Sequence, residues 1–188
     1  MPTLKKILSI TGFVIFICFP GISQANNIDL KSSRIYLENN IYYIDATYDF
    51  TFTKEVLDAL LHGIPLEIHT LFQLRLKRKW YWDKTISETK LSHRLEHQPL
   101  TQDYLTIDLK TGLHHSYDNL EAALNNIGTV SRQELFNQTL LQEEDDYYIA
   151  RFRTYLDLDA LPSPMRPQVY FSKAWDLDSK WHEWKLNQ

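Results

Sequence analysis

The sharpest match to a catalytic signature in this chain is His93-Arg94-Leu95-Glu96-His97, which has the H-x-x-E-H form of a class of zinc peptidases. Two histidines four residues apart share one metal ion only on a helix, where one turn brings them together. Apolar or histidine side chains instead alternate with polar ones from Leu91 to His97, and Pro99 follows. On a strand the two histidines lie about 13 Å apart, at ~3.3 Å per residue. We therefore expect a strand that faces solvent or lies at a sheet edge, and no zinc site.

A second pattern that could bind a ligand is Trp80-Tyr81-Trp82, which follows Arg78 and Lys79. Aromatic rings beside cations can form a platform for a sugar or a peptide. Arg78, Trp80 and Trp82 are therefore the candidate ligand-binding residues. The alternative, which we favour, is that Trp80 and Trp82 share one face of a strand and pack into the core. The C-terminal tryptophans, Trp175, Trp181 and Trp184, are expected to hold the last strands in the fold.

Other catalytic signatures are missing from the sequence. There is no glycine-rich phosphate loop, no nucleophile elbow and, after residue 25, no cysteine. The acidic run Glu143-Glu144-Asp145-Asp146 lacks the spaced ligands and the glycine of a calcium loop, so we expect a solvated hairpin turn. The sequence therefore predicts no catalytic residue, no metal site and no cofactor.

The first 25 residues predict where the protein works. A basic head, Lys5-Lys6, precedes an apolar run from Ile7 to Ile22 and a small-x-small site, Ser23-Gln24-Ala25. We expect a secretory signal peptide that is cleaved between Ala25 and Asn26. The alternative is an uncleaved anchor, but the 16-residue run is shorter than the roughly 20 apolar residues of a spanning helix.

Composition narrows the class of protein. Removal of the signal would leave 163 residues with 18 basic and 24 acidic side chains, a net charge of −6, which does not suit a nucleic-acid partner. The single cysteine, Cys18, would leave with the signal, so no disulfide can form. A disulfide-free exported domain fits a bacterial periplasm, and residues 26–188 are expected to form one domain.

Alternation with a period of two predicts that most of this domain is β-strand. A hairpin is expected over 28–53 around Asn39-Asn40, with further strands over 64–82, 86–96 and 105–109. In the strand over 64–82, the six alternate side chains from Leu66 to Leu76 are expected to share one face, and Glu67 and His69 to lie on the other. A second hairpin is expected from 135–141 and 147–156, and two short strands lie between 169 and 186.

Two segments have helical spacing instead. Thr53 is a predicted N-cap for a helix that Gly63 ends, and Asp118 is a predicted N-cap for a helix that ends at Gly128. A helix from Ser131 is the alternative to a strand there. The predicted fold is mainly β, an antiparallel β-sandwich with two short helices.

Several spaced motifs support a family resemblance. They are Ala59-Leu60-Leu61-His62-Gly63-Ile64-Pro65-Leu66, Arg78 with Trp80 and Trp82-Asp83, Leu156-Asp157, Leu161-Pro162-Ser163-Pro164-Met165-Arg166, and Trp175, Ser179, Trp181 and Trp184. Together they resemble the proteobacterial family of exported proteins named domain of unknown function 4390. The resemblance implies an exported protein with a fold rich in β-strands, and it provides no activity or catalytic residue. It also implies a link to a membrane histidine kinase, near whose genes members of the family often lie.

Two functions remain as hypotheses. The first is a periplasmic, non-enzymatic module that binds a protein partner, such as an envelope sensor kinase, or another envelope component. The second is a hydrolase that acts on envelope glycan or peptide, which requires two converging carboxylates or a histidine-metal site.

Overall fold

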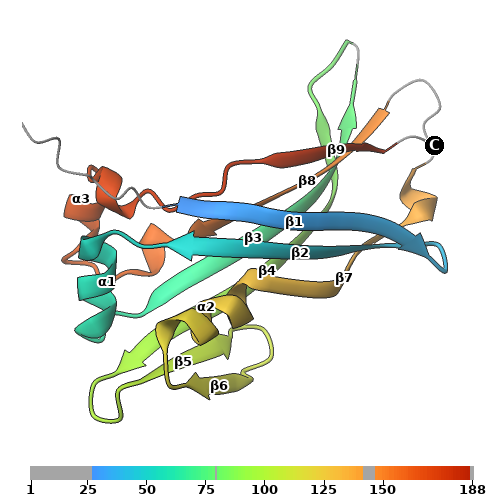
Figure 1. Ribbon diagram of the computed structural model, residues 1–188. Helices are drawn as coiled ribbons and strands as arrows, with labels where there is room; N and C mark the ends of the chain where they lie inside the picture. Colours follow the sequence, from blue (N-terminus) through green and yellow to red (C-terminus); the bar gives the residue numbers. More distant parts are fainter. Residues whose placement is uncertain (1–26, 79, 142–146, 187–188) are drawn as a thin grey trace, which may run out of the picture.

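The computed structural model describes residues 27–78, 80–141 and 147–186 (Figure 1). The predicted signal peptide, its cleavage site at Ala25 and Asn26, and the acidic run Glu143–Asp146 lie outside the described residues. Within the described ranges, no helix combines the length and the apolar character that crossing a membrane requires.

The fold is an antiparallel β-sandwich. Its strands are β1 (Asn27–Glu38), β2 (Ile41–Thr51), β3 (Leu66–Lys77), β4 (Lys84–Gln98), β5 (Asp103–Asp108), β6 (His114–Tyr117), β7 (Thr129–Asn137), β8 (Tyr147–Leu156) and β9 (His182–Leu186). They form a small sheet in the order β1-β2-β7 and a large sheet in the order β6-β5-β4-β3-β8-β9. The α-helices of the described residues are α1 (Lys54–Leu61), α2 (Leu120–Gly128) and α3 (Arg166–Val169). The predicted fold class is confirmed, and α3 is a helix that the sequence analysis did not predict.

The predicted first hairpin is confirmed. Asn39 and Asn40 have φ values of +50° and +64°, which suit a type I′ turn and which asparagine tolerates better than most residues. In β2, alternate side chains from Ile44 to Phe50 are buried, so one face of the strand lines the core.

The central strand of the large sheet is β3, which pairs with β4 on one side and with β8 on the other. All six alternate side chains that the sequence predicted to share a face, from Leu66 to Leu76, are buried. The two sheets meet through this face, and the Tyr48 ring packs edge-on against Phe152, with 5.8 Å between centroids. The opposite face of β3 therefore carries the polar side chains.

Two short helices close the sandwich. The Thr53 hydroxyl accepts a hydrogen bond from Val56 N and caps α1, as predicted. For α2 the cap is Asn119, whose side chain accepts from Ala122 N, so the prediction of Asp118 is wrong by one residue. In Figure 1, α2 lies beside β5 and β6, next to the small sheet.

Two strand predictions are wrong. The predicted second hairpin does not form, because β7 pairs with β2 in the small sheet whereas β8 pairs with β3 and β9 in the large one. Alternation identifies a strand but not its partner, which explains the error. The segment from Val169 to Leu186 contains one strand, β9, because its first part ends helix α3 and then forms a 3₁₀ turn at Lys173–Trp175. Residues from Ser131 form strand β7, so the alternative helix is also wrong.

We predict that Gly128→Ala destabilises the fold, because α2 lies close against β2 at this residue. A Cβ at Gly128 would lie 2.6 Å from the Tyr48 carbonyl oxygen and 3.0 Å from the Phe50 ring. Since a backbone oxygen cannot move without shifting β2, the free energy of unfolding should fall by about 1 to 3 kcal/mol in urea titrations. The control is Asn125→Ala on the exposed side of the same helix, for which a change within about 0.5 kcal/mol is expected. Equal stability of the two variants would contradict the close approach.

Candidate functional site

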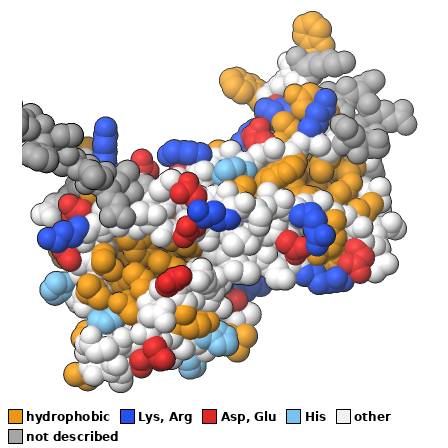
Figure 2. Space-filling view, in the orientation of Figure 1, with side chains coloured by type: hydrophobic (Ala, Val, Ile, Leu, Met, Phe, Trp, Pro, Cys, Tyr) orange, Lys and Arg blue, Asp and Glu red, His pale blue; other side chains and the backbone are white. Residues whose placement is uncertain are grey.

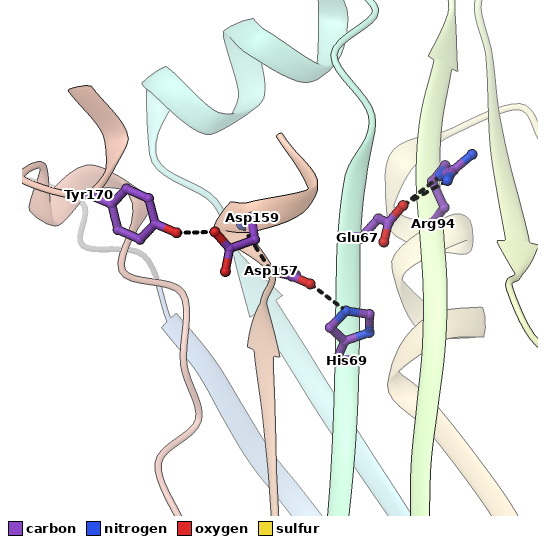
Figure 3. Close-up of polar contacts among 6 residues, drawn as sticks. All are labelled: Glu67, His69, Arg94, Asp157, Asp159 and Tyr170. Carbon is purple, nitrogen blue, oxygen red and sulfur yellow. Dashed lines mark hydrogen bonds and ion pairs between the residues drawn. The ribbon is translucent and has the colours of Figure 1, made fainter. Parts of the chain in front are cut away.

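Two places in the described structure bring together side chains that could bind or react. The first is the polar cluster, Glu67, His69, Arg94 and Asp157, on the outer face of the large sheet (Figure 3). The second is the hairpin tip, residues 78 and 80–83, in the connection between β3 and β4. They lie at opposite ends of β3.

The polar cluster is centred on His69, a β3 side chain that is only 3% exposed. Its Nε2 lies 2.9 Å from Oδ2 of Asp157, the residue that follows β8. The other carboxylate oxygen of Asp157 accepts a hydrogen bond from Asp159 N at 2.9 Å and so caps the next turn. The aspartate is therefore fixed by its own backbone turn, and it orients the imidazole.

Glu67 lies two residues before His69 on the same face of β3 and pairs with Arg94 on β4. Both Nε and Nη2 of Arg94 donate to Oε1 of Glu67, at 3.1 and 2.7 Å. One ligand atom from each of Glu67, His69 and Asp157 lies within 4.8 Å of the others. Two carboxylates and an imidazole suit zinc, manganese or iron, so these three are the described residues that could hold a metal ion.

The cluster is also coherent without a metal ion. Arg94 balances the charge of Glu67, and Asp157 occupies Nε2 of His69. If Nε2 bound a metal, Nδ1 would carry the proton, and Nδ1 has no hydrogen-bond partner within the described part of the chain. The geometry thus favours a structural link between β3 and the end of β8.

An open pocket of about 320 Å³ lies beyond Tyr155, whose ring packs against His69 at 5.6 Å between centroids. Its walls include Arg153, Lys173 and the aromatic ring of Tyr170. The Tyr170 hydroxyl donates to the Asp159 carboxylate, and this hydrogen bond raises the pKa of Tyr170. Asp176 and Asp178 also line the pocket, so it has aromatic walls and charges of both signs beside the polar cluster.

The H-x-x-E-H segment lies on β4, so the predicted strand is confirmed. The expectation of an exposed or edge position is wrong, because β4 is flanked by β3 and β5 and the His97 side chain is 8% exposed. The His97 Nδ1 lies 3.1 Å from the carbonyl oxygen of Leu61, at the end of α1, which covers this part of the strand. His93 is half-buried between the layers.

The predicted ligand-binding residues lie in the hairpin tip, where the two tryptophans are exposed to solvent. Trp80 is 90% exposed, Tyr81 77% and Trp82 93%, whereas Arg78 is half-buried. The favoured expectation that Trp80 and Trp82 pack into the core is therefore wrong. The physical reason is that β3 ends at Lys77, where its pairing with β8 ends too, so no strand in the described part of the chain covers these rings.

One acidic residue, Asp83, forms ion pairs at the base of the hairpin tip. Asp83 lies 2.6 Å from Lys77 Nζ and 3.5 Å from Arg75 Nη2. The hydrogen bond from Lys77 lowers the pKa of Asp83. This ion pair joins the two arms of the hairpin at the point where the strand ladder stops.

The C-terminal tryptophans pack within the fold, as expected. Trp175 is buried, and Trp184 stacks on Phe152 with 4.7 Å between centroids. The Trp181 ring is contacted by the guanidinium groups of Arg151 at 3.9 Å and Arg153 at 5.1 Å. These contacts attach β9 and the segment before it to β8.

Sequence reasoning placed Glu67 and His69 on the polar face of a strand but did not identify the polar cluster. Asp157 lies 88 residues after His69, and only the pairing of β3 with β8 brings the two together. Nothing in the local sequence pattern indicates that pairing, so no motif in the sequence points to the cluster.

The comparisons with known proteins give one match. A family model described as Domain of unknown function (DUF4390) matches residues 25–185. The comparisons with curated proteins and with solved structures found no match.

We predict that His93 makes the fold less stable in mild acid. Burial lowers the pKa of His93 from the ordinary value of 6.5, against an opposing effect of Asp108. The unfolded chain therefore binds a proton at a higher pH than the folded chain, so stability is full above about pH 6.5 and is lost as the pH falls through the folded pKa. The free energy of unfolding should decrease between pH 7.5 and pH 5, and His93→Asn should reduce that decrease.

The control for this pH dependence is His115→Asn, because His115 is exposed on β6. Urea titrations at both pH values should give the control the same pH dependence as the unmodified protein. An unchanged pH dependence in His93→Asn would contradict the assignment.

Proposed function

The chain belongs to the family described as Domain of unknown function (DUF4390), and from this premise we propose that it is an exported, periplasmic binding module without enzymatic activity. Its partner is a protein or another component of the cell envelope. The family resemblance makes an envelope sensor kinase the protein partner to test first.

The observation that supports this proposal is the exposure of the hairpin tip. Three consecutive aromatic side chains, Trp80, Tyr81 and Trp82, project where no other described element covers them. A soluble protein rarely exposes contiguous aromatic rings unless they contact another molecule. Tryptophan and tyrosine are also the residues most enriched in binding surfaces, since they combine a large apolar area with a polar group.

We predict that the hairpin tip forms specific contacts in the cell. A photo-reactive phenylalanine analogue at position 81 should give discrete crosslinked products after irradiation of intact cells, because position 81 lies at the centre of the exposed aromatic rings. The matched control places the analogue at Leu100, which is 99% exposed in another loop. Trp80→Ala/Trp82→Ala should remove the products at position 81. Equal labelling from positions 81 and 100 would contradict the proposal.

A second candidate, a hydrolase of envelope glycan or peptide, is favoured by one observation. The carboxylates of Glu67 and Asp157 converge with His69, and the pocket of about 320 Å³ lies close by. A metal ion held by these three residues would supply an activated water molecule. The binding module remains our first proposal, because Arg94 and the His69–Asp157 hydrogen bond already satisfy the cluster.

The hydrolase candidate predicts that one divalent ion binds per chain. Calorimetric titration with zinc or manganese should show one site, and Asp157→Asn should weaken binding about tenfold or more, since it removes a charged ligand. Asp159→Asn, two residues away and hydrogen-bonded to Tyr170, is the matched control and should leave the affinity unchanged. Absence of stoichiometric binding, or equal loss in both variants, would eliminate this candidate.

A further inference from the structure

We propose that the hairpin tip inserts into the interface of an anionic lipid bilayer. Trp80, Tyr81 and Trp82 lie at the level of the headgroups, and basic residues at the base of the tip contact lipid phosphates. This inference rests on the proposed function, since it names the envelope component that the tip binds.

The shape of the hairpin tip suits a soft surface. In Figure 1 the β3–β4 hairpin projects beyond the rest of the large sheet, and Figure 2 shows hydrophobic side chains standing clear of the body at this end. Lys77 is the last residue of β3 to pair with β8, so among the described residues no strand lies beside the connection that follows. A convex projection with aromatic rings at its end can enter an interface without needing a complementary cavity.

The charge of the hairpin is opposite to that of the chain. The described residues 75–78 and 80–84 contain four basic residues and one acidic residue, a net charge of +3, within a chain of net charge −4. The acidic residue, Asp83, is engaged by Lys77 and Arg75, which leaves Arg78 and Lys84 as described basic residues outside that ion pair. An anionic surface would attract the basic residues of this hairpin.

A neighbouring residue extends the aromatic surface. Tyr147 at the start of β8 pairs with Lys77 and is 45% exposed. The ammonium group of Lys185 lies 4.6 Å from the centre of the Tyr147 ring. Aromatic rings with adjacent cations therefore continue from the tip onto the edge of the sandwich.

A bilayer fits these features better than a small ligand or a protein. Small-molecule sites are concave, and the pockets of about 320 and 300 Å³ are lined by residues elsewhere in the fold. A stable protein interface buries roughly 800 Å² on each side with close shape complementarity and so needs surface beyond the tip, whereas a bilayer interface needs only the projecting rings. Tryptophan and tyrosine prefer the membrane interface, and lysine and arginine bind anionic headgroups.

The test uses purified residues 26–188, which contain all of the described core, because the apolar segment 1–25 would itself bind lipid. Flotation with vesicles of phosphatidylethanolamine and phosphatidylglycerol at 7:3 should recover the protein, whereas phosphatidylcholine vesicles should not. Binding should fall as sodium chloride rises from 50 to 500 mM, because salt screens the headgroup attraction. Trp80→Ala/Trp82→Ala and Arg78→Glu/Lys84→Glu should each reduce binding at least about tenfold.

The matched control is Phe171→Ala, which removes an aromatic ring that is 92% exposed but lies away from the hairpin tip. This variant should bind like the unmodified protein. All altered residues are at least partly exposed, and thermal unfolding will show that each variant remains folded. Equal losses in the Phe171 and tryptophan variants would overturn the assignment to the tip.

Insertion itself can be measured with one fluorophore. Residues 26–188 contain no cysteine, so Tyr81→Cys and Leu100→Cys each give a unique site for an environment-sensitive dye. Anionic vesicles should raise and blue-shift the emission from position 81 and leave position 100 unchanged. Unchanged emission at position 81 would overturn insertion.

The outcomes separate this inference from the function on which it rests. Failure to bind anionic vesicles, together with discrete protein adducts from position 81 in cells, would overturn the lipid inference and retain the binding module. Failure of both experiments would overturn both.

Discussion

The alternation of side chains along β3 is the constraint on which the rest of the structure depends. One face, from Leu66 to Leu76, is buried against the small sheet, and it fixes the register of β3 with β4 and β8. A shift by one residue would bring Glu67 and His69 into the core and expose the leucines. The same alternation that forms the core therefore holds Glu67 and His69 on the outer face, where Arg94 and Asp157 can reach them.

The extent of strand pairing explains why the hairpin tip is exposed. Lys77 is the last β3 residue to pair with β8, and the aromatic residues come after it. Burial of a large apolar side chain stabilises a fold by roughly 1.5 to 3 kcal/mol, and Trp80 and Trp82 contribute almost none of this. Their apolar surface remains available for binding, whereas that of Trp175 and Trp184 is already used to attach the C-terminal segment to β8.

Local patterns predicted most of the elements of the fold. Asn39-Asn40, the Thr53 cap and the alternation in β2 and β3 each act within a few residues, so the first hairpin, α1 and the face of β3 could be predicted. Sheet partners depend on contacts between distant segments, and this is why the assignment of β7 and β8 to different sheets could not be predicted.

The same distinction applies to the candidate sites. Arg78, Trp80 and Trp82 lie within five residues of one another, so the local sequence pattern was enough to identify them. Whether the rings are buried depends instead on where the pairing of β3 with β8 ends. The His69–Asp157 contact spans 88 residues, and no spacing rule indicates it. The H-x-x-E-H segment is the opposite case, in which a spacing rule indicates a site that the fold does not form. Its spacing matches a catalytic motif, but the strand on which it lies holds the two histidines in separate environments.

The two candidate sites also differ in the direction that they face. β3 contains 12 residues and spans about 40 Å at ~3.4 Å per residue, with the polar cluster near its beginning and the hairpin tip after its end. A tip held at a bilayer surface would direct α1, α3 and the pocket beside Tyr155 away from the lipid. Because the attraction to an anionic surface acts within about 10 Å at 0.1 M salt, the distant end would stay free of it. The hairpin tip would thus bind the membrane while the other end of the molecule faces away from it.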